Sequence, residues 1–499
     1  MLASCLNLID GFQQAWNDPQ RIDSPALADE NRALNYGELY AAVSQFAGQL
    51  HQAGIRYADR VALAIDRSAT LAVAILGTMA AGACPCPLEP KLGAAEAQRR
   101  TRVGGITWLL FDSAHADDAR NSGLPDERCL DLASLPPSAP YWTTRIEPAS
   151  DSFLLFTSGS SGKPKGVLQN HRGMLANAAG IIERTGLGPS DRLLHIMPLH
   201  HTNGINNQLL APLLAGSAVI VANRFKADNM PDLLARFKPT IVTGVPTMYA
   251  RMLPLTFSSE SLSSLRMLRC GSAPITEELH RRIEAKFALP LVVSYGLSEA
   301  TCTSTMNPPQ ARKLGSVGTP LQGQSVFLRG PAGQALRAAG GEGEICIAGP
   351  TLMTGYLQEG DAGMAQPVGD MVRTGDLGRF DPDGYLFITG RLKDVIIRGG
   401  ENLSPTLIEE AIATVPGVAA CCVVGKAHAD LGEVPVAFVV RQHNEAGTNL
   451  EPAAINAVVA SQLSRIHQPA QCFFVASLPE NATGKVDRKK LREQLAAAT

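Results

Sequence analysis

The sequence predicts an α/β protein with a large N-terminal domain of doubly wound sheets, a small β-barrel-like subdomain and a smaller α+β domain at the C-terminus. Three observations predict this arrangement. Apolar segments of strand length alternate with helical segments before Leu314, as in parallel sheets. After Leu314, short strands separated by glycines indicate hairpins. After Asp394 the pattern changes again, to helices and strands typical of a separate domain of roughly one hundred residues.

The first predicted elements are a helix and the strands on either side of the next helix. Asn35 and Glu38 have the spacing of a capping box, so a helix should begin there. Its buried face is marked by apolar residues at helical spacing, namely Leu39, Val43, Phe46 and Leu50. Residues 60–65 and 108–111 are predicted strands, and an alanine- and leucine-rich helix between them ends near Gly82.

A second series of short apolar strands follows a glycine-rich loop. These strands are 192–197, 218–221, 240–243, 267–270 and 291–294. Helices are predicted at 230–238 and 276–287. Ligands of doubly wound sheets bind at the carboxyl ends of the strands. The polar segments 197–204, 271–274 and 295–299 follow such ends, so we expect them to converge on one crevice.

The glycine-rich loop, residues 157–166, has the composition of a phosphate-binding loop. Glycines let backbone N–H groups turn toward an anion, while hydroxyls and lysines add donors and charge. It is not a Walker A loop, because Pro164 follows Gly162-Lys163. It is not a nucleophile elbow either, because Lys163 occupies the last glycine position. A plain glycine- and serine-rich surface loop is the alternative.

Composition excludes several classes of protein. The 44 basic and 46 acidic residues give a net charge of -2, which argues against nucleic-acid binding. The ten cysteines lack the paired spacing of a zinc site, and the N-terminus lacks an export signal. The most apolar segment, 71–88, is interrupted by glycines and prolines, so no integral membrane segment is expected. We therefore expect a cytoplasmic protein with reduced thiols.

The loop at 157–166 resembles the phosphate loop of the adenylate-forming enzymes, the AMP-dependent synthetase and ligase family that includes acyl-CoA synthetases. Further segments resemble motifs of this family in the same chain order: 271–274, 295–299, 373–377, 390–394 and 482–488. The resemblance implies that the chain uses ATP and Mg²⁺ to convert a carboxylic acid into an acyl adenylate, releasing pyrophosphate, and then transfers the acyl group to coenzyme A.

The resemblance also implies the residues that bind the nucleotide and CoA. They are Thr157, Ser158, Gly159, Ser160, Ser161, Gly162, Lys165, Gly271, Ser272, Ala273, Tyr295, Gly296, Ser298, Asp376, Arg391, Lys393, Gly399 and Gly400. Tyr295 would lie against adenine, and Asp376 would accept the ribose hydroxyls. Glu299 would be the ligand of Mg²⁺, a role suited to a carboxylate oxygen. Ser298 stands where the family has threonine, and it keeps the hydroxyl.

The implied catalytic residues are Lys485, Glu299, His201 and Lys165. Lys485 would bridge the substrate carboxylate and the α-phosphate. By the same resemblance, residues 1–392 form the adenylate-forming domain and 393–499 a mobile domain that turns about Lys393. That turn would withdraw Lys485 and bring Gly399 and Gly400 toward a pantetheine channel.

The acyl pocket is expected to involve His200, His201, Val245, Cys270, Leu297 and Thr303. Because these residues are mostly uncharged, they favour an apolar or weakly polar acid. His201 matches a family position that gates the acyl site, but His200 precedes it, so which ring gates stays open.

Three alternatives remain at this point. The acyl group could be loaded on a separate carrier protein instead of CoA, and the chain could form a homodimer. A nonenzymatic nucleotide-binding relative is the third, and it is disfavoured because Lys165, Glu299, Asp376 and Lys485 are all retained.

Overall fold

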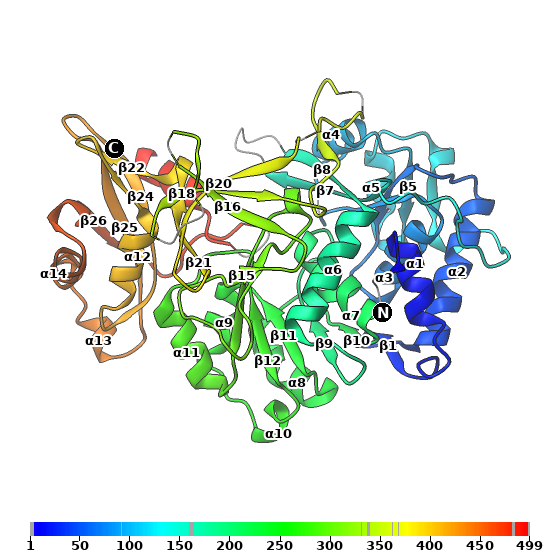
Figure 1. The fold of residues 1–499 in the computed structure, drawn as a ribbon, viewed down its shortest axis with the longest axis horizontal. Coiled ribbons are helices and arrows are strands. Elements are labelled where there is room, and N and C mark those ends of the chain that lie inside the picture. The colour runs from blue at the N-terminus through cyan, green and yellow to red at the C-terminus, as the bar shows by residue number, and fades with distance from the viewer. Residues whose placement is uncertain are drawn as a thin grey trace.

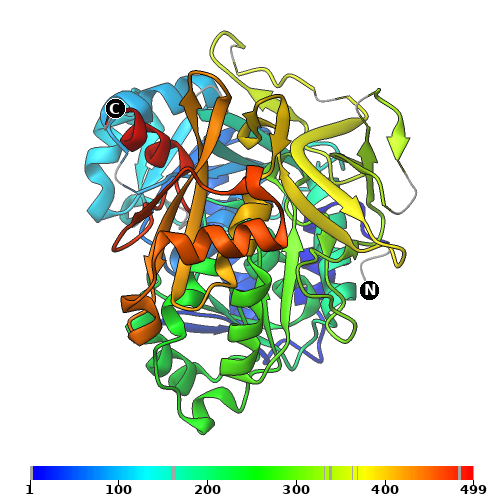
Figure 2. The same ribbon diagram turned by 90° about the vertical axis from the view of Figure 1, so that its left-hand side faces the viewer.

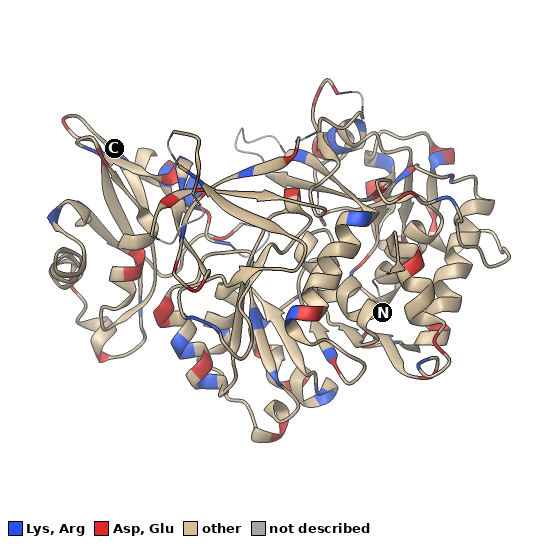
Figure 3. Ribbon diagram, in the orientation of Figure 1, with Lys and Arg blue, Asp and Glu red and all other residues tan. Residues whose placement is uncertain are grey.

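The computed structural model describes residues 4–90, 92–158, 164–330, 332–336, 340–361, 363–367, 369–481 and 485–497. Figure 1 shows a large body that carries the N-terminus and a smaller C-terminal domain at one end of it. Viewed from that end, the C-terminal helices and strands lie across the face of the larger body (Figure 2). Lysines, arginines and acidic residues intermingle along both parts (Figure 3).

The largest sheet has nine strands and contains the predicted parallel series. Its order is β15 (Thr319–Pro320), β14 (Thr305–Met306), β13 (Leu291–Tyr295), β12 (Met267–Cys270), β11 (Ile241–Gly244), β9 (Arg192–His195), β10 (Ala218–Val221), β1 (Pro25–Ala28) and β2 (Ala33–Asn35). The strands from β13 to β1 are parallel, and their carboxyl ends therefore share one edge.

Two smaller sheets complete the N-terminal half. A parallel sheet has the order β4 (Cys84–Pro87), β3 (Arg60–Ala64), β5 (Trp108–Phe111) and β6 (Cys129–Asp131). An antiparallel sheet has the order β19 (Gly355–Leu357), β8 (Pro164–Asn170) and β7 (Asp151–Ser158). The glycine-rich loop is therefore the connection between two antiparallel strands, β7 and β8.

The remaining sheets lie toward the C-terminus. One has the order β17 (Ala335–Leu336), β16 (Ser325–Arg329), β18 (Glu342–Ala348), β20 (Met371–Phe380) and β21 (Leu386–Arg391). The other contains β23 (Glu401–Leu403), β22 (Ile396–Arg398), β25 (Gly432–Arg441), β24 (Val418–His428) and β26 (Gln471–Phe474). The first is an open antiparallel sheet among the described residues, so the barrel-like closure expected from its hairpins is not seen.

Helices cover these sheets. They are α1 (Leu8–Trp16), α2 (Tyr36–Gln52), α3 (Ala69–Ala80), α4 (Ala94–Gly104), α5 (Ala116–Asn121), α6 (His171–Thr185), α7 (Ala211–Ala215), α8 (Met230–Phe237), α9 (Pro246–Met252), α10 (Ser259–Leu262), α11 (Glu277–Phe287), α12 (Pro405–Ala413), α13 (Glu445–Thr448), α14 (Pro452–Gln462) and α15 (Arg488–Ala497). A π-helix, η5 (Asn203–Leu210), precedes α7. No helix in the described ranges combines the length and hydropathy needed to cross a bilayer.

The expected helix after Asn35 forms as α2, and its start is a capping box. The Asn35 side chain accepts from the backbone N–H of Glu38, and the Glu38 side chain accepts from the N–H of Asn35. Its apolar face packs on α3, which is apolar on all sides and buried along its length. A Cβ on Gly77 would lie 2.7 Å from Cδ1 of Phe46, so glycine is needed for this close approach.

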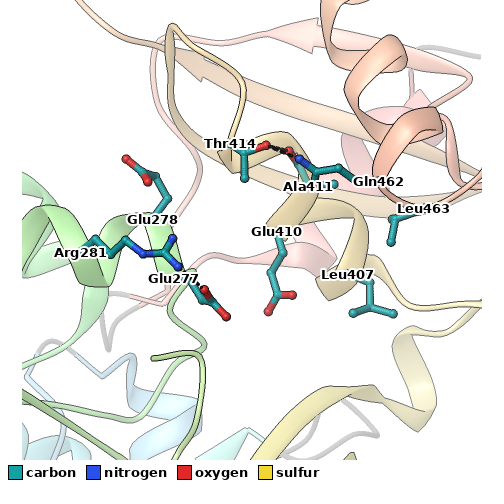
Figure 4. A pocket seen from close by; sticks show the side chains of 9 residues that line it. All are labelled: Glu277, Glu278, Arg281, Leu407, Glu410, Ala411, Thr414, Gln462 and Leu463. Carbon is teal, nitrogen blue, oxygen red and sulfur yellow. Dashed lines mark hydrogen bonds and ion pairs between the residues drawn. The ribbon is translucent and has the colours of Figure 1, made fainter. Parts of the chain in front are cut away.

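The C-terminal domain contacts the larger body where α12 faces α11. A pocket between these helices is lined by Glu277, Glu278, Arg281, Leu407, Glu410, Ala411, Thr414, Gln462 and Leu463 (Figure 4). Glu277 and Glu410 point into it from opposite sides. Burial raises the pKa of Glu410, and the neighbouring carboxylates of Glu277 and Glu409 raise it further. Nearby, Nη2 of Arg251 lies 2.7 Å from Oε1 of Glu480 and links α9 to the C-terminal domain.

Candidate active site

Asp376 is the centre of a buried polar contact between two sheets. It stands opposite Arg391 in the β20–β21 register, and Nε of Arg391 lies 2.7 Å from Oδ1 of Asp376. The hydroxyl of Tyr295, at the end of β13, donates to Oδ2 of Asp376 at 2.8 Å. Burial and the Asp376 carboxylate together raise the pKa of Tyr295. Asp376 is only 5% exposed, so its carboxylate is held in one orientation, as recognition of a sugar diol requires.

Lys165 and Glu299 meet at Tyr356, a residue of β19. Nζ of Lys165 lies 5.0 Å from the centre of the Tyr356 ring. The hydroxyl of Tyr356 donates to Oε1 of Glu299 at 2.9 Å. Lys165 also faces Thr157 across the β7–β8 hairpin. A cation and a carboxylate therefore lie at the open end of the predicted phosphate loop.

Part of that loop lies outside the described residues. This applies to Gly159, Ser160, Ser161 and Gly162, while Ser158 is described for its backbone alone. Their predicted contacts with phosphate stay predictions.

Lys485 reaches this site from the C-terminal domain. Its backbone N–H donates to Oδ1 of Asn481 at 3.1 Å, and its side chain interacts electrostatically with Arg391, Asp376 and Glu299. Burial and the charge of Arg391 lower the pKa of Lys485 to about 8, although Asp376 and Glu299 oppose the shift. The two domains thus bring one lysine to the carboxylates that were predicted to hold ribose and metal.

Lys485 is fixed by the helix that follows it. Arg488, the first residue of α15, makes a bidentate pair with Glu409 of α12, with both N–O distances 2.7 Å. Nη1 of Arg488 also donates to the carbonyl of Val423 at 2.6 Å. This contact anchors the chain three positions beyond Lys485.

The site suits a metal that is held mainly by phosphate. In the described ranges, no group of three or more His, Cys, Asp or Glu side chains could hold a metal ion on its own. Mg²⁺ typically takes one or two carboxylates, with waters and substrate phosphates completing its shell. Glu299 beside Lys165 and the phosphate loop fits that pattern.

Two glycines permit a close approach of backbone around the crevice. A Cβ on Gly296 would lie 1.8 Å from the carbonyl oxygen of Cys302, so no other residue fits without a shift. A Cβ on Gly271 would lie 2.9 Å from Oγ of Ser294. Ser272, which precedes Ala273, has a φ of 67° and accepts from Nδ2 of Asn203 at 3.0 Å. The main chain is therefore closely packed at the ends of these strands.

His200 and His201 lie together with ring centres 4.5 Å apart. Their Nε2 atoms are buried and have no hydrogen-bond partner in the described part of the chain. Burial lowers the pKa of His200 to about 4 and that of His201 to about 3, so both rings are neutral at neutral pH. Lys485 is among the charges acting on His201, which places that ring at the border of the site.

One pocket lies at the strand ends, and of the residues predicted for the acyl site it includes Thr303. The pocket at the strand ends is lined by Thr202, Asn203, Asn207, Ser272, Ser294, Tyr295, Gly296, Cys302 and Thr303. Val245 and Cys270 instead pack in a hydrophobic cluster with Leu194 and Met197. Alternation along β12 explains this for Cys270, because neighbouring side chains point to opposite faces of a sheet. Leu297 does not line this pocket either and precedes η7 (Ser298–Ala300).

Asn207 of this pocket was not predicted from the sequence, whereas Asn203 lies in the segment 197–204 that was expected at the crevice. Asn203 and Asn207 come from η5, whose amide-rich sequence Asn-Gly-Ile-Asn-Asn-Gln has no apolar periodicity to mark a helix. The amide nitrogen of Asn207 donates to Oδ1 of Asn203 at 3.0 Å and to Oγ1 of Thr303 at 3.1 Å. The position after a strand end was the one available signal.

The residues predicted to act after domain rotation are exposed. Lys393 is exposed in η8 (Leu392–Asp394), which joins β21 to the C-terminal sheet. Gly399 and Gly400 form the exposed turn between β22 and β23, with φ of 58° and 89°. Lys485, by contrast, lies close enough to Asp376 and Glu299 for an electrostatic interaction, and the predicted domain rotation stays a prediction.

Comparison with known families identifies the family of this chain. Residues 13–357 match the model of the AMP-binding enzymes, and residues 407–485 match the model of the AMP-binding enzyme C-terminal domain. The chain belongs to the AMP-binding enzyme family. This AMP-binding enzyme is 32% identical over 492 residues to a sulfoacetate–CoA ligase of Cupriavidus necator, covering 95% of each chain. It is 31% identical over 473 residues to a feruloyl-CoA synthase of Amycolatopsis, covering 93% and 94%.

Solved structures resemble the AMP-binding enzyme over nearly its whole length. ATP-bound MatB from Rhodopseudomonas palustris superposes with a TM-score of 0.88 at 29% identity, covering 98% of this chain and 99% of that one. The o-succinylbenzoate CoA synthetase of Bacillus subtilis, in complex with ATP and magnesium, superposes with a TM-score of 0.81 at 27% identity and 98% and 99% coverage. These matches confirm the expected α/β fold with its C-terminal domain.

Proposed function

We propose that this AMP-binding enzyme joins a small polar organic acid to coenzyme A. The general reaction is ATP-dependent acid–CoA ligation, with ATP, Mg²⁺ and CoA as its cofactors. An oxygen of the acid attacks the α-phosphorus of ATP, the bond to pyrophosphate breaks, and an acyl adenylate forms. The CoA sulfur then attacks the acyl carbonyl, the thiol proton is released, and AMP leaves.

The observation that carries this proposal is the meeting of Lys485 with Asp376, Arg391 and Glu299 across the domain boundary. The first step brings two anions together, the carboxylate and the triphosphate. Fixed cations offset their repulsion and stabilise charge on the pentavalent phosphorus. Lys485 supplies one such cation and Lys165 another, while bound Mg²⁺ would neutralise phosphate charge beside Glu299.

Asp376 and Tyr295 have positioning parts in this mechanism. The Asp376 carboxylate can accept both ribose hydroxyls when its contacts to Tyr295 and Arg391 rearrange. The Tyr295 ring, at the border of the acyl pocket, offers a face for adenine. The neutral His201 ring, which is close enough to Lys485 for an electrostatic interaction, would exclude water from the carbonyl without adding charge.

The polar pocket supports a polar acid, where the sequence favoured an apolar or weakly polar one. Its lining includes the hydroxyls of Thr202 and Ser294 and the amides of Asn203 and Asn207. The named relatives act on acids of different kinds, an aliphatic sulfonate and an aromatic acid. The family alone therefore leaves the acid open, and the lining residues carry this part of the proposal.

A pyrophosphate-release assay tests the function. The purified protein is incubated with ATP, Mg²⁺ and a panel of aliphatic, aromatic and dicarboxylic acids, with and without CoA. We expect AMP formation with a restricted set of polar acids, and acyl-CoA when CoA is present. AMP formation with none of the acids would reject the proposal. Acyl transfer to a phosphopantetheinylated carrier protein but not to CoA would favour the carrier-loading alternative.

A further inference from the structure

Arg269 is a fully buried cation with unused donors. It lies in β12, and its side chain is 1% exposed. Its Nη1 donates to the carbonyl oxygen of Asn207 at 3.4 Å, but Nε and Nη2 have no hydrogen-bond partner among the described residues. Buried guanidinium groups are normally paired with anions, because an unpaired buried charge is costly. Arg269 therefore lacks the anion that its burial calls for.

No described side chain supplies that anion. The charges acting on Arg269 come from Cys302, Tyr249 and Arg266, and none of these is a carboxylate. Arg266, three residues earlier in the chain, is already paired: its Nε lies 2.7 Å from Oδ1 of Asp191. Burial lowers the pKa of Arg269 to about 10, so the guanidinium is protonated at neutral pH.

The surroundings of Arg269 form a buried polar layer. Arg269 pairs with Thr243 of β11 in the parallel register, so both side chains point to the same face of the sheet. Oγ1 of Thr243 is buried without a hydrogen-bond partner in the described chain, as is Nε2 of Gln208 on η5. Unsatisfied donors thus occur on the strands and on the helix that covers them.

This layer adjoins the acyl pocket. Asn207 contacts Arg269 through its carbonyl, while its amide lines the pocket together with Cys302. Cys302 is itself close enough to Arg269 for an electrostatic interaction. At the other border of the pocket, Tyr295 contacts Asp376, which acts on Lys485. Tyr295 thus links one border of the pocket to Asp376 and Lys485. Asn207 links the opposite border to the unpaired Arg269 behind it.

We propose that Arg269 binds a second anionic group of the acid, a carboxylate or a sulfonate, and so makes the enzyme selective for dianionic acids. This inference rests on the proposed function, since it specifies the acid that the pocket accepts. The reacting carboxylate lies toward Lys485, and the distal anion pairs with Nε and Nη2 of Arg269 past the Asn207 and Cys302 side chains. A guanidinium suits both anions because its N–H groups match two oxygens at once.

Matched acid pairs test the proposal on the wild-type enzyme. The pairs are butanedioate with butanoate, 3-sulfopropanoate with butanoate, and benzene-1,3-dicarboxylate with benzoate; the monoamide of butanedioate serves as an uncharged isostere. We expect kcat/KM for the preferred dianionic acid to exceed that of its monoanionic partner by at least ~10-fold, since a buried guanidinium would otherwise stay unpaired. A preference for the monoanionic partner in every pair would overturn the inference.

Variants of Arg269 provide the second test. In Arg269→Met we expect kcat/KM for the dianionic acid to fall about 100-fold, mainly through KM, while that for its monoanionic partner changes less than about 3-fold. Arg269→Lys keeps the charge and should recover part of the preference. The matched control is Arg266→Met, which removes a paired arginine of the same chain segment and should lower the melting temperature without changing the ratio.

The outcomes separate the two proposals. An equal loss for both acids in Arg269→Met would give Arg269 a structural role only and overturn the inference. If that variant fails to fold, the wild-type pairs and Arg269→Lys decide. If no acid releases pyrophosphate, the proposed function fails, whatever Arg269 does. If monoanionic acids alone are activated, the function stands and the inference fails.

Discussion

Lys485 loses its proton more easily than an ordinary lysine, and this predicts a pH dependence. Its pKa is lowered to about 8 by burial and by Arg391. Adenylation requires the protonated form, so kcat/KM for acid-dependent ATP–pyrophosphate exchange should be full below pH 8 and fall as the pH rises through 8. Bound ATP adds negative charge, which raises the pKa of Lys485. The alkaline decrease in kcat should therefore lie at higher pH than the decrease in kcat/KM.

The variant Lys485→Arg tests whether Lys485 causes the alkaline decrease in activity. An arginine stays protonated over the whole range. The exchange activity that remains in Lys485→Arg should therefore show no alkaline limb. His200 and His201 do not compete for the assignment, because burial places their pKa values at about 4 and about 3. An unchanged limb in Lys485→Arg would assign it to another group.

At this scale the sequence predicts residues with a motif and misses those without one. Asp376, Tyr295, Glu299 and Lys485 were predicted as one site, and the structure brings them together. Their proposed roles stay predictions. Arg269 lies in an apolar strand, and nothing in the sequence distinguishes it from a surface arginine. Its burial depends on η5 folding over the sheet, a contact between residues far apart in the chain.

The helix α15 depends on one ion pair with α12, which gives a stability prediction. Arg488→Met leaves the Glu409 carboxylate buried without its cation, with the N–H of Val423 and the thiol of Cys422 as remaining donors among the described residues. Removing one partner of a buried pair costs about 3–5 kcal/mol. We expect the C-terminal domain to melt earlier in thermal denaturation, and adenylation to weaken because Lys485 precedes this anchor.

The neighbouring lysine is a matched control for this variant. Lys489 is exposed, and its Nζ lies 3.8 Å from Oε1 of Glu493. Surface ion pairs contribute little, so Lys489→Met should change stability by less than about 0.5 kcal/mol. Equal destabilisation by the two variants would mean that the Arg488–Glu409 pair has no special part in holding α15.

Elements with strong local signals were predicted well. The capping box of α2 and the apolar strands β9 to β13 depend on neighbouring residues, so the sequence pattern is sufficient for them. Among the elements that were not predicted, two show opposite reasons. The π-helix η5 is too polar to show a period, and β19, with its three residues, is too short. Both elements carry or border the site.

The connection between the two domains, at Lys393, gives a prediction that separates adenylate formation from thioester formation. Lys393 is exposed at the junction, so its replacement removes little packing. Proline would restrict the backbone rotation proposed at this position, which would bring Gly399 toward CoA. In Lys393→Pro we expect ATP–pyrophosphate exchange within about 3-fold of wild type, and acyl-CoA formation at least ~10-fold slower.

Two comparisons make this test specific. Lys393→Ala removes the side chain but keeps the backbone free, so both half-reactions should persist. An equal loss of both half-reactions in Lys393→Pro would indicate general misfolding and contradict a hinge at this position. The readout is single-turnover formation of adenylate and of thioester on the same preparation.

For the whole molecule, the sequence predicts the order of the parts but not their contact. The α/β body and the α+β domain follow from local patterns. The contact of Arg251 with Glu480 joins segments far apart in the chain, and no pattern within either segment encodes it. The same holds for the approach of α12 to α11. Which reaction step the docked arrangement serves is therefore visible only in three dimensions.

The pocket between Glu277 and Glu410 gives the proposed motion of the domain a pH dependence. Because burial and the Glu277 carboxylate across the domain contact raise the pKa of Glu410, the docked form should bind a proton more tightly than a separated form. This contribution to docking is present at low pH and is lost as the pH rises through the raised pKa. We therefore expect acid to favour the docked arrangement of Lys485 and alkali to disfavour it. With the proposed rotation, the proton concentration would shift the balance between forming the adenylate and consuming it.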